Sequence, residues 1–170
     1  MQFAKLVAEQ MRTSLPALYD QGPAVSTYDM TRLWISFARQ YLSASEVLHG
    51  RDSPLILPWI QISGHAMECS LKSFLCASGE RVPRDHDLVV LLDVAQRVGL
   101  VIEDKDTAML VHLNHLYSRG MHTPTRYKAR FPSDRWEFIG GTIPEQDFLK
   151  RIVQDICNQA VGVNERNRVK

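Results

Sequence analysis

The residues of this sequence that are best suited to bind a charged ligand are concentrated in one basic stretch. Between positions 119 and 135 the chain has five arginine or lysine side chains and a single acid. The basic residues are Arg119, Arg126, Lys128, Arg130 and Arg135, and the acid is Asp134. Clustered positive charge attracts phosphate groups. The stretch therefore predicts a site for a phosphate-bearing partner, with a solvated loop as the simpler interpretation.

Two further patterns have the spacing of side chains that interact on a helix. Glu68 and Lys72 are four positions apart in the orientation that favours an ion pair, and the simplest interpretation is a pair on the helix surface. His112 and His115 would share one helix face, with His122 just beyond, and could offer nitrogen ligands to a metal ion. No carboxylate or thiolate in the local sequence completes that ligand set, so neither a metal nor another cofactor is expected.

Familiar catalytic motifs do not occur. The sequence has no phosphate-binding glycine loop, no Cys-x-x-Cys, no His-Glu-x-x-His and no Gly-x-Ser-x-Gly. Its three cysteines are an odd number, and Cys69 and Cys76 are seven positions apart, so they would lie on the same helix face. We expect them to be small buried residues with reduced thiols, which indicates a cytoplasmic setting.

Length and composition predict one globular domain. The chain has 170 residues, 45% of them hydrophobic and 23% charged, which is enough for a sizeable core without disulfides. Lys5, Glu9 and Arg12 interrupt the apolar run that a secretory signal needs. The longest stretch without Asp, Glu, Lys or Arg, residues 53–67, is too short for a membrane span. We therefore expect a single domain over 1–170 that does not cross a membrane.

Hydrophobic residues recur at intervals of three and four positions in several segments, as on amphipathic helices. Main helices are predicted over 26–49, 58–77, 87–98, 105–117 and 142–161, and a short one over 2–12 within an N-terminal arm, 1–25. Glycines and prolines predict a long connection over 118–143, with a short extended piece at 136–139. The fold class is therefore all-α, with four to five main helices bundled over 26–163 and a frayed basic tail over 164–170.

Local signals define the predicted helix ends. Ser26 or Thr27 would cap the first main helix, and Asp85 would cap the third. Gly79 is suited to end the second helix in a left-handed conformation. Small residues at 63–66 lie in the middle of that helix, where glycine is costly, so we expect a neighbouring helix to approach closely there.

Several motifs, in order, resemble the HEPN domain family. Residues 64–79, GHAMECSLKSFLCASG, are similar to the family's A-x-E-x-x-L-K-x-x-L helix and the glycine after it. Residues 86–92, HDLVVLL, are similar to its H-D-L triplet and leucine-rich helix. The closing elements look like LNHLY at 113–117 and Arg126-Tyr127. The resemblance covers roughly residues 30 to 130.

The resemblance implies a fold, a ligand class and partners. HEPN domains are up-down helical bundles that usually dimerise, and many bind or act on RNA or nucleotides, often beside a nucleotidyltransferase. Catalytic members carry an arginine, four to six residues, and then a histidine, and they cleave RNA without a metal. In that chemistry the histidine moves a proton and the arginine stabilises charge on the phosphate.

The expected Arg–His motif departs from the family pattern. Arg119 and His122, the catalytic candidates, are separated by two residues rather than four to six. Arg81 and His86 have four residues between them but lie one helix too early, at the H-D-L triplet. His86 there is more simply a structural residue beside a helix cap.

Three hypotheses for function follow. The preferred one is a binding module for RNA, a nucleotide or another phosphate-bearing ligand, acting as a homodimer and as a possible partner of a nucleotidyltransferase. Its ligand-binding residues would be Arg126, Tyr127, Glu68, Lys72 and His86. The second is a metal-independent endoribonuclease of the toxin type that uses the Arg–His pair described above. The third is a protein interaction module that pairs through an apolar helix face, such as that of Trp34 or Trp59.

Overall fold

A computed structural model describes residues 26–49, 56–121 and 144–168. These residues form five α-helices and no strand, which confirms the all-α prediction. The helices are α2 (Thr27–His49), α3 (Ile56–Ala77), α4 (Leu88–Arg97), α5 (Asp104–Met121) and α7 (Gln146–Arg168). The predicted helix over 2–12 and the predicted extended piece at 136–139 lie outside the described residues.

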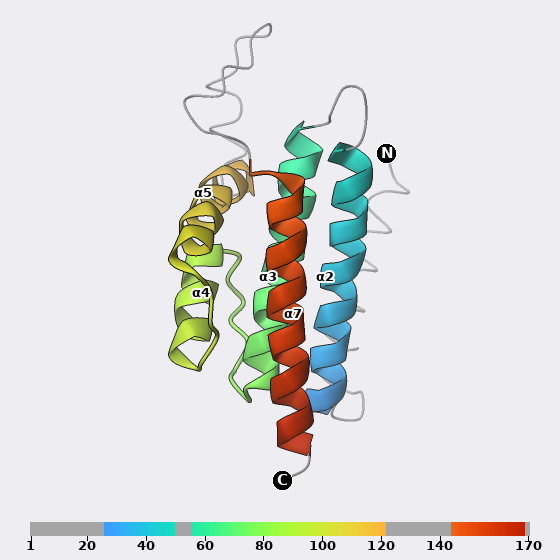
Figure 1. Ribbon diagram of the computed structural model, residues 1–170, viewed down its shortest axis with the longest axis vertical. Coiled ribbons are helices and arrows are strands. Elements are labelled where there is room, and N and C mark those ends of the chain that lie inside the picture. The colour runs from blue at the N-terminus through green and yellow to red at the C-terminus, as the bar shows by residue number, and fades with distance from the viewer. Residues whose placement is uncertain (1–25, 50–55, 122–143, 169–170) are drawn as a thin grey trace, which may run out of the picture.

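The helices form an up-down bundle around α3 (Figure 1). α2 runs antiparallel to α3, and α7 lies against both of them and points the same way as α3. On the other side of α3, α4 and α5 make an antiparallel pair (Figure 1). Because α2, α4, α5 and α7 all contact α3, nearly every side of the central helix is covered.

The core is built on the inner faces of these helices. Met67, Leu71, Phe74 and Leu75 of α3 are all fully buried, and the apolar stripe of α7 packs against the same cluster. Burial of one such side chain contributes about 1.5 to 3 kcal/mol. This packing, rather than helix propensity, fixes the positions of the polar residues that the same helices carry.

Two predicted helix ends are confirmed and one cap is corrected. Ser26 caps α2, since its Oγ accepts a hydrogen bond from the Asp29 amide at 3.1 Å, and Gly79 follows α3 with φ +80°. The cap of α4 is Asp87, not Asp85, because Asp87 Oδ1 accepts from two backbone amides of α4 at 2.9 and 3.2 Å. Asp85 instead accepts from the Asp87 amide at 3.0 Å and supports the cap.

The C-terminal helix is longer than predicted. α7 continues to Arg168, so the prediction of a helix end near 161 and a frayed tail from 164 is wrong. Asn164 is buried and its Nδ2 donates to the Tyr28 carbonyl at 3.4 Å, while Asn167 Nδ2 donates to the Ala77 carbonyl at 2.9 Å. These contacts hold the last turns of the helix against α2 and the end of α3.

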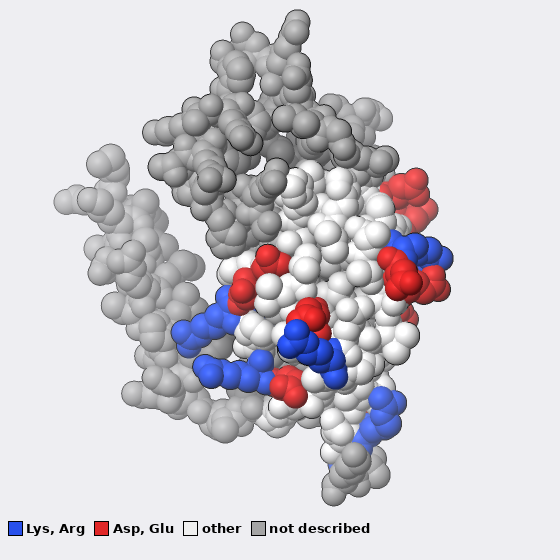
Figure 2. All heavy atoms as spheres, turned by 90° about the vertical axis from the view of Figure 1, so that its left-hand side faces the viewer, with Lys and Arg blue, Asp and Glu red and all other residues white. Residues whose placement is uncertain are grey.

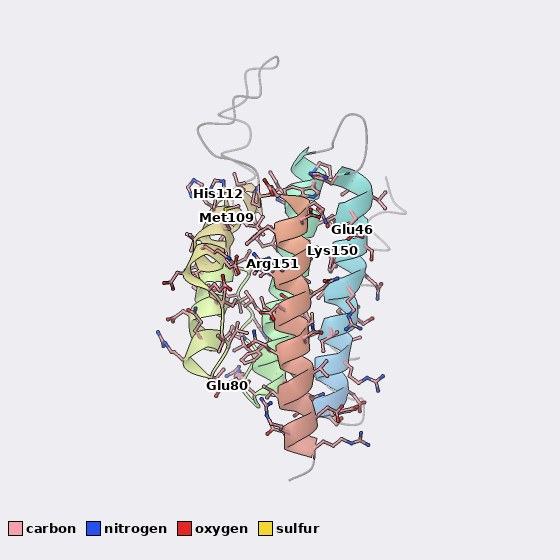
Figure 3. All side chains as sticks on the ribbon, viewed as in Figure 1. Glu46, Glu80, Met109, His112, Lys150 and Arg151 are labelled. Atoms are coloured by element: carbon pink, nitrogen blue, oxygen red, sulfur yellow. The ribbon has the colours of Figure 1, made fainter. Side chains whose placement is uncertain are left out.

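Polar contacts fix α7 along its length. Arg151 forms a two-pronged ion pair with the buried Asp106 of α5, at 2.6 and 2.8 Å. On the other side of α7, Lys150 reaches Glu46 of α2 at 3.0 Å (Figure 3). Within the described residues, no helix is long and apolar enough to cross a bilayer.

Candidate functional site

The most concentrated group of interacting polar side chains in the described structure surrounds Glu68. Glu68 as a whole is only 4% exposed, although its side chain carries a charge. It accepts hydrogen bonds from Lys72 Nζ at 2.7 Å, from Tyr117 Oη at 2.7 Å and from His86 Nδ1 at 3.0 and 3.1 Å. The donors come from α3, from α5 and from the segment before α4. We call Glu68, Lys72, Tyr117, His86 and the adjacent His65 the Glu68 cluster.

The predicted Glu68–Lys72 pair forms, but its predicted place on the helix surface is wrong. Lys72 is 5% exposed, so both charges are buried. Spacing within one helix shows that two side chains can meet, whereas burial depends on the helices packed around them. Lys72 Nζ also lies 5.5 Å from the centre of the Trp34 ring of α2, a cation–π distance that helps a buried ammonium group.

Glu68 is ionised inside the cluster. Burial by itself raises the pKa of this carboxyl, but its contacts with His65, Lys72, Tyr117 and His86 lower the pKa by more and hold it well below the usual range. His65 Nδ1 is 3.8 Å from Oε2, which is too long for a hydrogen bond, so its contact is electrostatic. With Lys72 as counter-ion, the cluster holds one negative and one positive charge when both histidines are neutral.

Tyr117 joins α5 to the cluster through an unusually close helix contact. Its side chain is fully buried, and burial together with the hydrogen bond to Glu68 raises the pKa of its hydroxyl, which stays protonated. A Cβ atom at Gly64 would overlap the Tyr117 ring, so only glycine allows this approach. The expectation that a neighbouring helix comes close at residues 63–66 is thereby confirmed.

Two imidazoles form the exposed edge of the cluster. The side chain of His65 is 31% exposed and that of His86 is 44% exposed. His86 directly precedes the α4 cap and turns its Nδ1 edge toward Glu68. The cap is tied to α5 as well, because Asn114 Nδ2 donates to Asp87 Oδ1 at 3.1 Å. The His86 backbone is therefore fixed beside two helices.

Helix α2 contributes aromatic rings next to this edge. Tyr41 stacks on the His65 ring with centroids 5.3 Å apart, and Trp34 meets Phe37 edge to face at 6.2 Å. Trp59, in contrast, is 2% exposed and its Nε1 donates to Gln146 Oε1 at 2.7 Å. The hypothesis that Trp59 offers an apolar face for protein pairing is therefore wrong.

The structure brings only some of the predicted site residues together. Glu68, Lys72 and His86 are in one cluster, whereas Arg81 is exposed in the segment before it. Arg119 belongs to α5, two residues after Tyr117, but its side chain is outside the described part, as are His122, Arg126 and Tyr127 entirely.

Sequence reasoning missed His65 and the role of Tyr117. A signal for His65 was present, because positions 65 and 68 are three apart and share a helix face. The contact of Tyr117 with Glu68 joins positions 49 apart and has no local signal.

Other reactive groups are inert or isolated. The three cysteines are buried with reduced thiols, as predicted, and burial raises the pKa of Cys69 to about 12 and that of Cys157 to about 11. These thiols are poor nucleophiles near neutral pH. In the described segments no three His, Cys, Asp or Glu side chains are grouped so that they could hold a metal ion.

Comparison with known proteins agrees with the motifs and the fold. A family model described as the HEPN domain matches residues 31–156. That match covers most of the chain and includes α3, α4, α5 and the Glu68 cluster, so the chain belongs to the HEPN domain family. Searches of curated proteins and of solved structures gave no match.

Proposed function

We propose that this HEPN domain binds an RNA, a nucleotide or another phosphate-bearing ligand beside the Glu68 cluster. In this proposal Arg119, His122 and Arg126 contact phosphate oxygens, and Tyr127 stacks on a base or donates its hydroxyl. The family supports the ligand class, since HEPN domains are often linked to RNA or nucleotides. The basic residues begin two positions after Tyr117, which is itself a member of the cluster.

One observation carries the proposal: two partly exposed imidazoles from two segments converge on one buried carboxylate. His86 is hydrogen-bonded to Glu68 directly, and His65 is linked to it through Tyr117. An ion pair with Lys72 alone would be enough to neutralise Glu68, so the histidines are not needed for that purpose. An imidazole has two ring nitrogens, so one can face the cluster while the other is left to contact a polar ligand at the surface. Glu68 and Lys72 are buried and would act by orienting the histidines rather than by touching the ligand.

The charges of the described surface also favour phosphate contacts from the residues that follow Tyr117 at the C-terminal end of α5. Figure 2 shows the side of α4 and α5, where large areas carry no charged side chain. Two described basic groups on this side are paired with acids, Arg97 with Asp93 at 2.5 Å and Lys105 with Glu103 at 2.7 Å. Paired surface charges attract phosphate weakly. The basic stretch 119–135 therefore remains the best source of phosphate contacts.

We further propose that the protein is a homodimer and a partner of a nucleotidyltransferase. HEPN domains often dimerise, and α2 exposes Leu33 at 43% and Phe37 at 39%. Size-exclusion chromatography with light scattering should show a dimer that Leu33→Glu dissociates. If this variant loses dimerisation and keeps RNA binding, the two roles are separate. If neither the wild-type protein nor the variant binds RNA, the protein interaction hypothesis becomes the better one.

An endoribonuclease function is the second candidate, and one observation favours it. His86 is held by a carboxylate in the manner of an oriented general base. Either Arg119 with His122 or Arg81 with His86 would supply the acid–base and phosphate groups. Incubation of a mixed RNA pool with EDTA tests this candidate, because metal-dependent contaminants are then silent. Cleavage that persists in the Arg119→Ala, His122→Ala double variant and stops in His86→Ala would select the second pair.

The binding proposal is tested by salt-dependent titration of the same RNA pool. Wild-type affinity should fall as salt rises, and Arg126→Ala should weaken binding and reduce the slope of log K against log salt by about one. Arg97→Ala, a change to an exposed arginine in α4, should alter neither quantity. Wild-type affinity that stays constant across salt concentrations would refute phosphate binding.

A further inference from the structure

His65 lies in the Glu68 cluster with a ring that is held in place from two sides. Tyr41 of α2 stacks on one face of the imidazole at 5.3 Å, with the planes 29° apart. Tyr117 of α5 meets it edge-on at 5.4 Å. Helix α3 supplies the backbone, and Gly64 leaves the space that Tyr117 occupies. Three helices thus fix the ring of a histidine whose side chain is 31% exposed.

The hydrogen bonds of Tyr117 determine which nitrogen of His65 carries the proton. Tyr117 Oη has one hydrogen, and it is donated to Glu68 Oε2 at 2.7 Å, because an ionised carboxylate can only accept. Oη must therefore act as the acceptor in its 3.0 Å contact with His65 Nδ1. In the neutral form of the ring, Nδ1 therefore bears the hydrogen and Nε2 has the lone pair.

The outer nitrogen of His65 is consequently a hydrogen-bond acceptor of fixed direction. Within the described part of the chain, the polar contacts of His65 are made by Nδ1. An acceptor cannot bind a phosphate oxygen that has lost its hydrogen, so it suits a different group of the ligand. It needs an O–H or N–H donor.

We propose that His65 reads a ribose hydroxyl of the ligand through Nε2 and so makes the site selective for ribonucleotides. This inference rests on the proposed function, since it assigns the sugar contact of the same ligand whose phosphates the arginines would hold. The 2′-hydroxyl is the donor that distinguishes RNA from DNA. Tyr117 and Glu68 fix the orientation of the His65 ring, and a ligand without the 2′-hydroxyl would lose the hydrogen bond to Nε2, which gives the discrimination.

The test compares two ligands that differ in that donor alone. A single-stranded RNA oligomer and its 2′-fluoro counterpart have the same sequence and charge, but the fluorine cannot donate a hydrogen bond. Wild-type protein should bind the RNA about tenfold more tightly, which corresponds to about 1.4 kcal/mol. His65→Phe, which keeps a ring against Tyr41, should bind both ligands equally, at the affinity of wild type for the 2′-fluoro oligomer.

His115→Phe is the matched control, because His115 is exposed on α5 and absent from the cluster. It should keep the full preference for RNA. A merely structural role of His65 would weaken both ligands alike and preserve their ratio, which would overturn the inference. Equal binding of both ligands by wild type would also overturn it while leaving the proposed function intact, whereas no binding of either ligand would refute both.

Discussion

Glu68 and Asp106 are both buried carboxylates, yet their surroundings differ. Asp106 of α5 is 3% exposed, and a single guanidinium, that of Arg151, occupies both of its oxygens. Glu68 of α3 is 4% exposed and divides its oxygens among Lys72, Tyr117 and His86. One carboxylate therefore has one partner, and the other has several partners of different chemistry.

This difference separates a structural ion pair from a candidate functional cluster. The Asp106–Arg151 pair joins α5 to α7 with good two-pronged geometry, and both oxygens of the carboxylate bond the same guanidinium group. Glu68 instead connects the interior to two imidazoles at the surface. Burial raises the pKa of Glu68 while its donors lower it below the usual range, and for Asp106 the hydrogen bond from Arg151 is the leading cause of a lowered pKa.

The largest expected effect is a difference in unfolding free energy between variants of the two carboxylates. Glu68→Gln should cost about 3 to 5 kcal/mol of unfolding free energy, because it leaves the Lys72 ammonium buried without a counter-ion. Asp106→Asn should cost about 1 to 3 kcal/mol, since the half-exposed Arg151 can be solvated by water. Urea unfolding at pH 7 measures both. A smaller loss for Glu68→Gln than for Asp106→Asn would contradict the comparison.

Acid should reveal the same difference through the pH dependence of stability. The folded pKa of Glu68 lies below its usual 4.5, so its contribution is complete above that pH and is lost as pH falls toward the folded value. For Asp106 the corresponding loss begins lower, below its usual 3.8. In urea titrations across this range, Glu68→Gln should flatten the wild-type curve from about pH 4.5 downward, and Asp106→Asn should flatten it only below about pH 3.8. Parallel curves for all three proteins would argue against ionised native carboxylates.

Substitution of two helical glycines should change the unfolding free energy by an intermediate amount, and it tests the packing of the Glu68 cluster. Gly64→Ala places a methyl group into the Tyr117 ring and should destabilise the protein by about 1 to 3 kcal/mol through overpacking. Gly162→Ala meets only Arg166 Nη1, at 3.7 Å, and should stabilise α7 by about 0.5 to 1 kcal/mol. Thermal unfolding of both variants should therefore move in opposite directions. A stable Gly64→Ala protein would show that Tyr117 is not held as described.

The smallest effect is expected at the surface. Glu46→Ala removes the partner of Lys150, but both side chains are well exposed, at 39% and 49%. The change should alter the unfolding free energy by less than about 0.5 kcal/mol. A loss as large as that of Asp106→Asn would mean that exposure does not separate the ion pairs of this protein.

The periodicity of apolar residues was sufficient to predict where the helices lie, but not the contacts between them. The spacing of apolar residues predicted α2 and α3 closely, because both have strong stripes and clear end signals at Ser26 and Gly79. It failed at the end of α7, where Asn164 and Asn167 stabilise the helix through carbonyls more than 85 positions away in sequence. Contacts at that separation leave no periodic pattern.

The candidate site was predicted in part for the same reason. The motif containing Glu68 and Lys72 was visible, and the i, i+4 spacing correctly predicted that the two meet. Their burial, the convergence of His86 from another segment and the role of Tyr117 depend on packing between α3, α4 and α5. Only the three-dimensional arrangement joins these residues into one cluster.

The most direct measurement compares RNA binding by folded Glu68→Gln and Asp106→Asn proteins. Both are titrated with the same RNA oligomer, at neutral pH and at a temperature where circular dichroism shows each variant folded. If the Glu68 cluster orients ligand-binding histidines, Glu68→Gln should weaken binding about tenfold, or about 1.4 kcal/mol, and Asp106→Asn should bind as wild type. Equal affinities for the two variants would contradict the account, because the two carboxylates would then have the same structural role.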